Sequence, residues 1–233
     1  MSRIPLLLLP GTLCNHRLWA HQVLHLSDIA QPMVMDVGSH PSTESQARQL
    51  LQQAPSRFAL AGLSYGGILA LEVMRQAPER ISHLALLNTN ARPDIPENEA
   101  SRRRQLQHAQ RQGLESLLRE TLIPLYLHED NRDNSPLIQT IVDMAVACGM
   151  EVFYNQLEAV RTRADSRPTL GAIHCPTLVL GGKEDVICNP DRHQEMAEEI
   201  PDARLVLLER CGHLSTLEQP EVVTAELRAW LSR

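Results

Sequence analysis

The sequence predicts an α/β fold with three layers, in which helices cover both faces of a mostly parallel sheet of about six strands. Short apolar runs alternate with helical segments from residue 4 to residue 87, and the same alternation returns from residue 177 to residue 231. Strands that alternate with helices are typical of βαβ units, whose strands are parallel. Between the two regions the chain is polar and helical, so we predict a helical cap inserted after the fourth strand.

In the first region, each predicted strand is an apolar run that ends at turn-forming residues, and each predicted helix shows apolar positions at helical spacing or a capping residue. The strands are residues 4–9, 32–37, 58–63 and 81–87. The helices are residues 14–26, 44–53 and 67–76. In the second region the strands are residues 177–180 and 204–208, and the helices are residues 191–199 and 221–231. We therefore predict a core of residues 1–91 and 168–233 and a cap of residues 92–167.

The composition limits the classes of partner. A net charge of −6 argues against nucleic acid or an anionic membrane as the main partner. The five cysteines show no CxxC spacing, so we expect reduced thiols, no metal and no cofactor in a cytoplasmic protein. The apolar run Leu6-Leu7-Leu8-Leu9 is too short to span a membrane and reads as a buried strand. We expect a monomer or a homodimer.

The motif Gly62-Leu63-Ser64-Tyr65-Gly66 lies between the third predicted strand and the helix that follows. A serine at such a sharp strand-to-helix turn has its hydroxyl exposed at the sheet edge, beside a helix N-terminus that favours negative charge. Glycines two residues before and after the serine let the chain fold back. By itself the pentapeptide also fits a glycine-rich turn capped by serine, but its position favours a nucleophile.

Polar residues at other strand ends supply the partners that such a serine needs. Asp185 follows the fifth strand and His213 follows the sixth, so nucleophile, acid and base come in the order Ser, Asp, His. His213 would accept the serine proton, and Asp185 would orient the imidazole. Glu184 competes with Asp185 for this role, and the Gly181-Gly182 pair and Pro190 favour Asp185. The backbone N–H groups of Tyr65 and Thr12 are predicted to bind the oxyanion, with Leu13 as the alternative to Thr12.

On these segments the whole chain resembles the α/β-hydrolase superfamily, in its small single-cap bacterial branch. The resemblance rests on four segments: Leu9-Pro10-Gly11-Thr12 with Trp19, the Ser64 motif, Gly182-Lys183-Glu184-Asp185, and Gly212-His213 followed by Glu218-Gln219-Pro220. It implies a nucleophile at Ser64, an acid at Asp185, a base at His213 and oxyanion amides at Thr12 and Tyr65. Two segments depart from the family pattern: Pro10-Gly11 replaces the frequent His-Gly, and the loop after the second strand differs. The antiparallel N-terminal strands common in the family are expected to be missing.

The predicted cap gives less information about the substrate. Arg102, Arg103 and Arg104 cannot all point the same way on a helix, so most of their charge is expected on a solvated face, with a carboxylate-binding arginine as the minority alternative. Apolar cap residues are expected to pack on the core, and some to line an acyl pocket: Leu106, Leu114, Leu117, Leu118, Leu122, Leu125, Met144 and Phe153.

The leading hypothesis is a serine hydrolase that cleaves a small, largely apolar carboxylic ester through an acyl-enzyme. The same triad also serves lactone hydrolysis, C–C bond hydrolysis and pyruvate-eliminating lyases. A ligand-binding relative without catalysis is the alternative from another class, which the intact Ser, Asp and His set disfavours.

Overall fold

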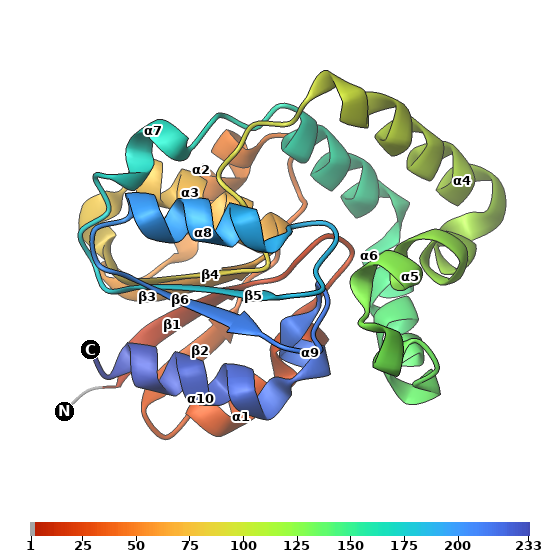
Figure 1. Ribbon diagram of the computed structural model, residues 1–233. Coiled ribbons are helices and arrows are strands. Elements are labelled where there is room, and N and C mark those ends of the chain that lie inside the picture. Colours follow the sequence, from red (N-terminus) through yellow and green to blue (C-terminus); the bar gives the residue numbers. More distant parts are fainter. Residues whose placement is uncertain (1–2) are drawn as a thin grey trace.

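A single six-stranded sheet forms the centre of the computed structural model, which describes residues 3–233 (Figure 1). The strands are β1 Ile4–Leu9, β2 Ala30–Val34, β3 Phe58–Leu63, β4 Ile81–Leu87, β5 Thr177–Gly182 and β6 Ala203–Leu208. Their order is β2-β1-β3-β4-β5-β6, and every neighbouring pair is parallel. The predicted fold class is therefore confirmed.

Helices cover both faces of this sheet. On one face lie α1 Ala20–Leu26 and α10 Pro220–Leu231, and on the other lie α2 Thr43–Gln53, α3 Tyr65–Gln76 and α8 Pro190–Glu199 (Figure 1). Successive residues of a strand point to opposite faces, so β1 feeds both layers: Leu6 and Leu8 belong to one buried cluster, Leu7 and Leu9 to the other. Burial on both faces explains why these strands are almost continuously apolar.

Most predicted elements agree with the structure to within two residues at each end, and two differ more. The second strand is Ala30–Val34 and not residues 32–37, because residues 30–34 pair with β1 and the chain leaves the sheet before Asp36. Pro32 is tolerated there since β2 is an edge strand. The first predicted helix is divided into a 3₁₀ turn, His16–Trp19, and the helix α1. Sequence reasoning also missed the short helix α9, Ser215–Glu218, directly after His213.

Residues 92–167 are helical, as predicted, and lie beyond the carboxyl ends of the strands, at the right of Figure 1. Their main elements are α4 Glu99–Leu117, a π-helical turn Leu118–Leu122, α5 Ile123–Tyr126 and α6 Ser135–Arg161. The short helix α7, Arg167–Leu170, begins where this segment ends and lies near α8 at the upper left of Figure 1. Gly113 interrupts α4 at φ 90° and Gly149 interrupts α6 at φ 82°. Glycine adopts positive φ without a Cβ clash, so both helices bend at these residues.

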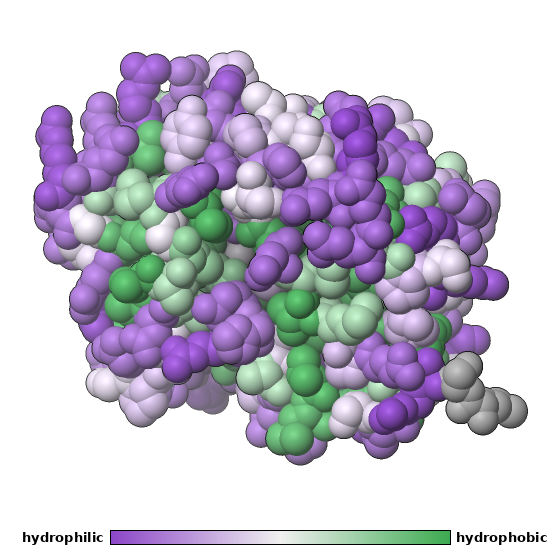
Figure 2. All heavy atoms as spheres, turned by 180° about the vertical axis from the view of Figure 1, so that it is seen from behind, coloured by the Kyte–Doolittle hydropathy of each residue, from purple (hydrophilic) through white to green (hydrophobic). Residues whose placement is uncertain are grey.

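Helix α6 is the one helix of residues 3–233 that is long and apolar enough to cross a membrane, judged by length and composition alone. Core helices of globular proteins meet the same criterion, and in α6 Ile141, Met144 and Phe153 are buried against the rest of the chain. Its other face leaves Val146 and Tyr154 exposed. Viewed from behind, apolar residues gather on the side of the molecule where α4–α6 lie (Figure 2).

Candidate active site

Ser64 occupies a strained turn between β3 and α3. Its φ of 56° and ψ of −115° lie in a region that side chains rarely adopt. A Cβ on Gly62 would lie 2.2 Å from the Gly66 carbonyl oxygen, and one on Gly66 would lie 2.1 Å from the Leu9 carbonyl oxygen. The two glycines are therefore required by close backbone approach, and together they hold Ser64 above the end of the sheet.

The strand order reverses between β1 and β3, since β2 lies on one side of β1 and all later strands lie on the other. Ligands of parallel α/β sheets bind in the crevice at such a reversal, outside the carboxyl ends of the strands. Thr12 follows β1 and Ser64 follows β3, so this topology brings the two predicted residues to one crevice.

Ser64, His213 and Asp185 form a continuous chain of hydrogen bonds. His213 Nε2 lies 2.8 Å from Ser64 Oγ, and His213 Nδ1 lies 2.8 Å from Asp185 Oδ2. The Asp185 and His213 side chains are almost fully buried. The Asp185 carboxylate can only accept a hydrogen bond, so the neutral imidazole carries its proton on Nδ1 and donates it to Asp185. Nε2 is then free to accept from the Ser64 hydroxyl. This is the arrangement that a serine needs in order to lose its proton as it attacks.

The surroundings of Asp185 keep it ionised. Burial disfavours its charge, but His213 and the hydrogen bonds from Cys188 and Asn88 hold the pKa of this carboxyl below its ordinary value. Its Oδ1 accepts from the Ile187 and Cys188 backbone N–H groups, each at 2.9 Å. The competing carboxylate, Glu184, points elsewhere and accepts from the Cys211 N–H at 2.9 Å.

Asn88, directly after β4, is a residue to which the sequence analysis assigns no role. Its Nδ2 donates to Asp185 Oδ2 at 3.0 Å and to the Gly212 carbonyl at 3.1 Å, and its Oδ1 accepts from Ser215 Oγ. It is fully buried. Asn88 therefore ties the acid to the loop that carries the base.

Glu218 holds the histidine loop from a second direction. Its carboxylate accepts from the Gly212 N–H at 2.9 Å, the His128 N–H at 2.8 Å and Asn131 Nδ2 at 3.0 Å. The Tyr126 carbonyl also accepts from the His213 N–H at 2.7 Å. The α5 region thus joins directly to the loop of the predicted base, a long-range relation with no local sequence signal.

Thr12 and Tyr65 both line the cavity above Ser64, and their backbone N–H groups have no partner within residues 3–233. Tyr65 is the first residue of α3, where helical N–H groups lack an intrahelical acceptor. The Leu13 N–H, by contrast, donates to Gln156 Oε1 at 2.9 Å. Leu13 is therefore engaged elsewhere, which favours Thr12 over Leu13 as the donor from this loop.

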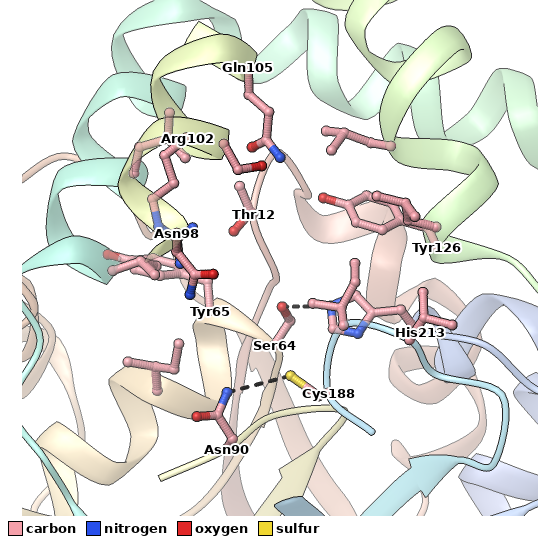
Figure 3. A pocket seen from close by; sticks show the side chains of 18 of the residues that line it. Thr12, Ser64, Tyr65, Asn90, Asn98, Arg102, Gln105, Tyr126, Cys188 and His213 are labelled. Atoms are coloured by element: carbon pink, nitrogen blue, oxygen red, sulfur yellow. Dashed lines mark hydrogen bonds between the residues drawn. The ribbon is translucent and has the colours of Figure 1, made fainter. Parts of the chain in front are cut away.

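A cavity of about 420 Å³ opens above Ser64, between the strand ends and helices α4–α6 (Figure 3). Tyr65, Asn98 and Arg102 lie on one side of it, across from Tyr126 and His213 (Figure 3). Of the eight apolar cap residues predicted to pack on the core or line a pocket, Leu106 and Leu125 are not buried. Leu122, Leu125 and Phe153 line the cavity.

Three cysteines lie near the site but are poor nucleophiles. Burial raises the pKa of the Cys188 thiol to about 12, and burial also raises the pKa of Cys14 and Cys211. Asp185, Cys188 and His213 are close enough to share a metal ion, with ligand atoms within 4.8 Å. However, the carboxylate and the imidazole already bond to each other, and the thiol is neutral, so this set fits a proton relay better than a metal centre.

The fold and this site define a hydrolase with a serine at a nucleophile turn. The model of the alpha/beta hydrolase family matches residues 6–226, and the chain belongs to that family.

Named relatives agree with this class. An esterase from Thermogutta terrifontis, solved with malate bound, is 31% identical over 99% of this chain and 90% of its own, with a TM-score of 0.87. The enol-lactonase of Burkholderia xenovorans is 26% identical over 100% of this chain and 93% of its own, with a TM-score of 0.90. A pimeloyl-[acyl-carrier protein] methyl ester esterase of Nitrosomonas europaea is 25% identical over 93% of this chain and 91% of its own.

Proposed function

We propose that this hydrolase cleaves small carboxylic esters through an acyl-enzyme on Ser64. The observation that carries the proposal is the hydrogen-bonded chain from Ser64 through His213 to Asp185 at the base of the cavity. A cavity of about 420 Å³ suits a small substrate. The esterases among the similar proteins support the same reaction class.

In the first half of the reaction, Ser64 Oγ attacks the ester carbonyl carbon while His213 Nε2 takes the hydroxyl proton. The carbonyl oxygen becomes an oxyanion, which the N–H groups of Thr12 and Tyr65 bind. The C–O bond then breaks, and His213 returns the proton to the leaving alcohol. Loss of one oxyanion donor typically costs about 2.7–4 kcal/mol of transition-state stabilisation.

In the second half, His213 removes a proton from a water molecule that attacks the acyl carbon. Ser64 leaves with the proton held by His213, and the acid product is released. Asp185, ionised throughout, stabilises the imidazolium that forms in each half.

A lactone is the second candidate substrate, supported by the likeness to an enol-lactonase over the whole chain. A lactone is a cyclic ester, so the same attack by Ser64 opens its ring. Residues 92–167 would act as the cap that selects between such substrates. We also propose that the enzyme is cytoplasmic.

The test is the Ser64→Ala variant with a short-chain p-nitrophenyl ester. The expected result is a loss of kcat of at least about 10⁴-fold with little change in melting temperature, because the nucleophile is removed and the one hydrogen bond lost is that to His213 Nε2. Mass spectrometry after fluorophosphonate treatment should show one adduct on Ser64. Retention of most activity in the variant would contradict the proposal.

A further inference from the structure

The cavity above Ser64 has a positively charged wall. Arg102 on α4 and Arg163, two residues after α6, place their guanidinium groups in its lining. Among residues 3–233, no carboxylate lines the cavity. This contrasts with the chain as a whole, whose net charge is −6. Most of the charge of the three consecutive arginines was expected on a solvated face, and Arg103 and Arg104 are exposed, whereas Arg102 lines the cavity.

One buried carboxylate, Asp94, lies behind this wall. Asp94 Oδ2 accepts from Arg102 Nε at 2.7 Å, and Asp94 Oδ1 accepts from Arg102 Nη2 at 2.7 Å and from Asn98 Nδ2 at 2.8 Å. Burial disfavours its charge, but the bonds from Arg102 and Asn98 hold the pKa of this carboxyl below its ordinary value. Asp94 therefore neutralises one guanidinium and fixes the orientation of Arg102.

Arg163 shares the same carboxylate at a longer distance, 3.7 Å between its Nη1 and Asp94 Oδ1. Its Nε and Nη1 donate to the carbonyl oxygens of Arg92 and Val160. Its side chain is only 8% exposed. Within residues 3–233, Arg163 Nη2 and Arg102 Nη1 have no acceptor.

The two guanidiniums and one carboxylate leave an excess of one positive charge at the cavity wall. Other nearby acids are engaged away from it: Glu195 pairs with Arg92, and Glu99 pairs with Arg103 on the outer face. A guanidinium keeps its charge even when buried, and its planar set of donors suits a carboxylate. An anion from the substrate is the partner that would balance this wall.

We infer that the substrate carries a free carboxylate, bound by Arg102 and Arg163, at the end of its acyl chain remote from the scissile carbonyl. The substrate class is a half-ester of a short dicarboxylic acid, or a lactone with a carboxylate side chain. The inference rests on the proposed acylation of Ser64. Asn98 and Gln105 lie beside Arg102 in the cavity and add neutral donors (Figure 3).

The test compares p-nitrophenyl half-esters of succinic, glutaric, adipic and pimelic acid with the matching half-amides, in which a neutral carboxamide replaces the free carboxylate. For at least one chain length, kcat/KM for the acid should exceed that for the amide by about 10- to 100-fold, the range of a charge-assisted hydrogen bond. Raised salt should reduce the ratio only weakly, since the site is largely buried. Equal rates at every chain length would overturn the inference.

Variants locate the effect. Arg163→Gln and Arg102→Gln should each lower the acid-to-amide ratio toward one, because either variant leaves a single guanidinium that Asp94 already balances. Arg103→Gln is the matched control, because Arg103 is adjacent in sequence but 69% exposed and paired with Glu99 on the outer face. It should leave the ratio at the wild-type value. An acid-to-amide ratio that stays at the wild-type value in both the Arg163 and the Arg102 variant would show that the substrate carboxylate is recognised elsewhere.

A binding measurement separates this inference from the proposed function. Glutarate, adipate and their monoamides are titrated into the Ser64→Ala protein by calorimetry. At least one dicarboxylate should bind more tightly than its monoamide, by about tenfold or more, and Arg163→Gln should remove the difference. Such binding would stand even if no ester were cleaved, whereas ester cleavage without any carboxylate preference would leave the proposed function intact and refute the inference.

Discussion

The two walls of the cavity above Ser64 are built differently. The wall at the strand ends carries Ser64, Asp185 and His213, each fixed by a short turn at the end of a strand and by buried hydrogen bonds. The opposite wall comes from helices with glycine bends and from the segment after α6, and its charged groups are Arg102 and Arg163. The first wall suits attack by Ser64 on an ester, and we propose that the second wall selects the substrate.

The difference explains why the same chemistry is found with many substrates on one fold. Backbone geometry at a strand end admits few solutions, since a Cβ on Gly62 or Gly66 would collide with the main chain. A helix placed over the sheet can present many different side chains without disturbing the strands beneath it. Substitutions should therefore act on rate at one wall and on substrate preference or stability at the other.

After Ser64→Ala, the largest effect is expected for Asp185→Asn at the strand-end wall. The amide can hold His213 in the wrong tautomer and cannot stabilise the imidazolium, so kcat should fall by about 10³- to 10⁴-fold. Glu184→Gln is the matched control, because the Glu184 carboxylate accepts from the Cys211 N–H, and the amide oxygen of a glutamine can accept the same hydrogen bond. Steady-state kinetics with a p-nitrophenyl ester measures both. A larger loss in the Glu184 variant would reverse the assignment of the acid.

A smaller loss is expected for Asn88→Ala. The substitution removes the donor shared by Asp185 and the Gly212 carbonyl, so acid and base lose their fixed spacing. We expect kcat to fall by about 10- to 100-fold with KM little changed, the range for one buried hydrogen bond to a charged group. Asn88 positions the triad and does not touch substrate, so an effect on KM alone would contradict this account.

Gln156 tests whether the two walls are separate, because it belongs to α6 but holds the loops of the core. It accepts from the Leu13 N–H and donates to the Val37 carbonyl at 3.1 Å. Gln156→Leu should lower kcat by about tenfold, through a displaced Thr12 amide, and should destabilise the fold by about 1–3 kcal/mol. Denaturant unfolding and kinetics measure the two effects. An unchanged kcat would show that this loop does not depend on α6.

The smallest effect is a change in the pH dependence of the unfolding free energy, and it concerns Asp94 behind the wall that carries Arg102 and Arg163. The folded-state pKa of Asp94 is below its ordinary value, so Asp94 binds fewer protons when the protein is folded. Its contribution is complete above about pH 5 and is lost as pH falls through about 4 and below. Asp94→Asn should therefore flatten the decline of the unfolding free energy from pH 5 to pH 3. Parallel curves for wild type and variant would show that Asp94 is not the titrating group.

The sequence determined the sheet and the strand-end wall. Short apolar runs that end at turn residues and alternate with helices are typical of strands buried on both faces, and residues that follow parallel strands meet at one edge. That local logic placed Ser64, His213 and Asp185 correctly at strand ends, and the structure joins them by hydrogen bonds. The second strand begins two residues and ends three residues earlier than predicted, because an edge strand is fixed by pairing with its neighbour and not by its own pattern.

Only the tertiary structure decided the rest. A run of three arginines does not reveal which one turns inward, since that depends on how α4 lies over the sheet and on Asp94, eight residues earlier. Gln156 and Glu218 act on loops distant in the chain, and no spacing in the sequence records such contacts. The division into a core and a cap of residues 92–167 stays a prediction, because Phe153 and Ala159 of α6 pack into the buried clusters of the sheet. Strand ends follow local rules, whereas a substrate-facing wall depends on how distant segments pack.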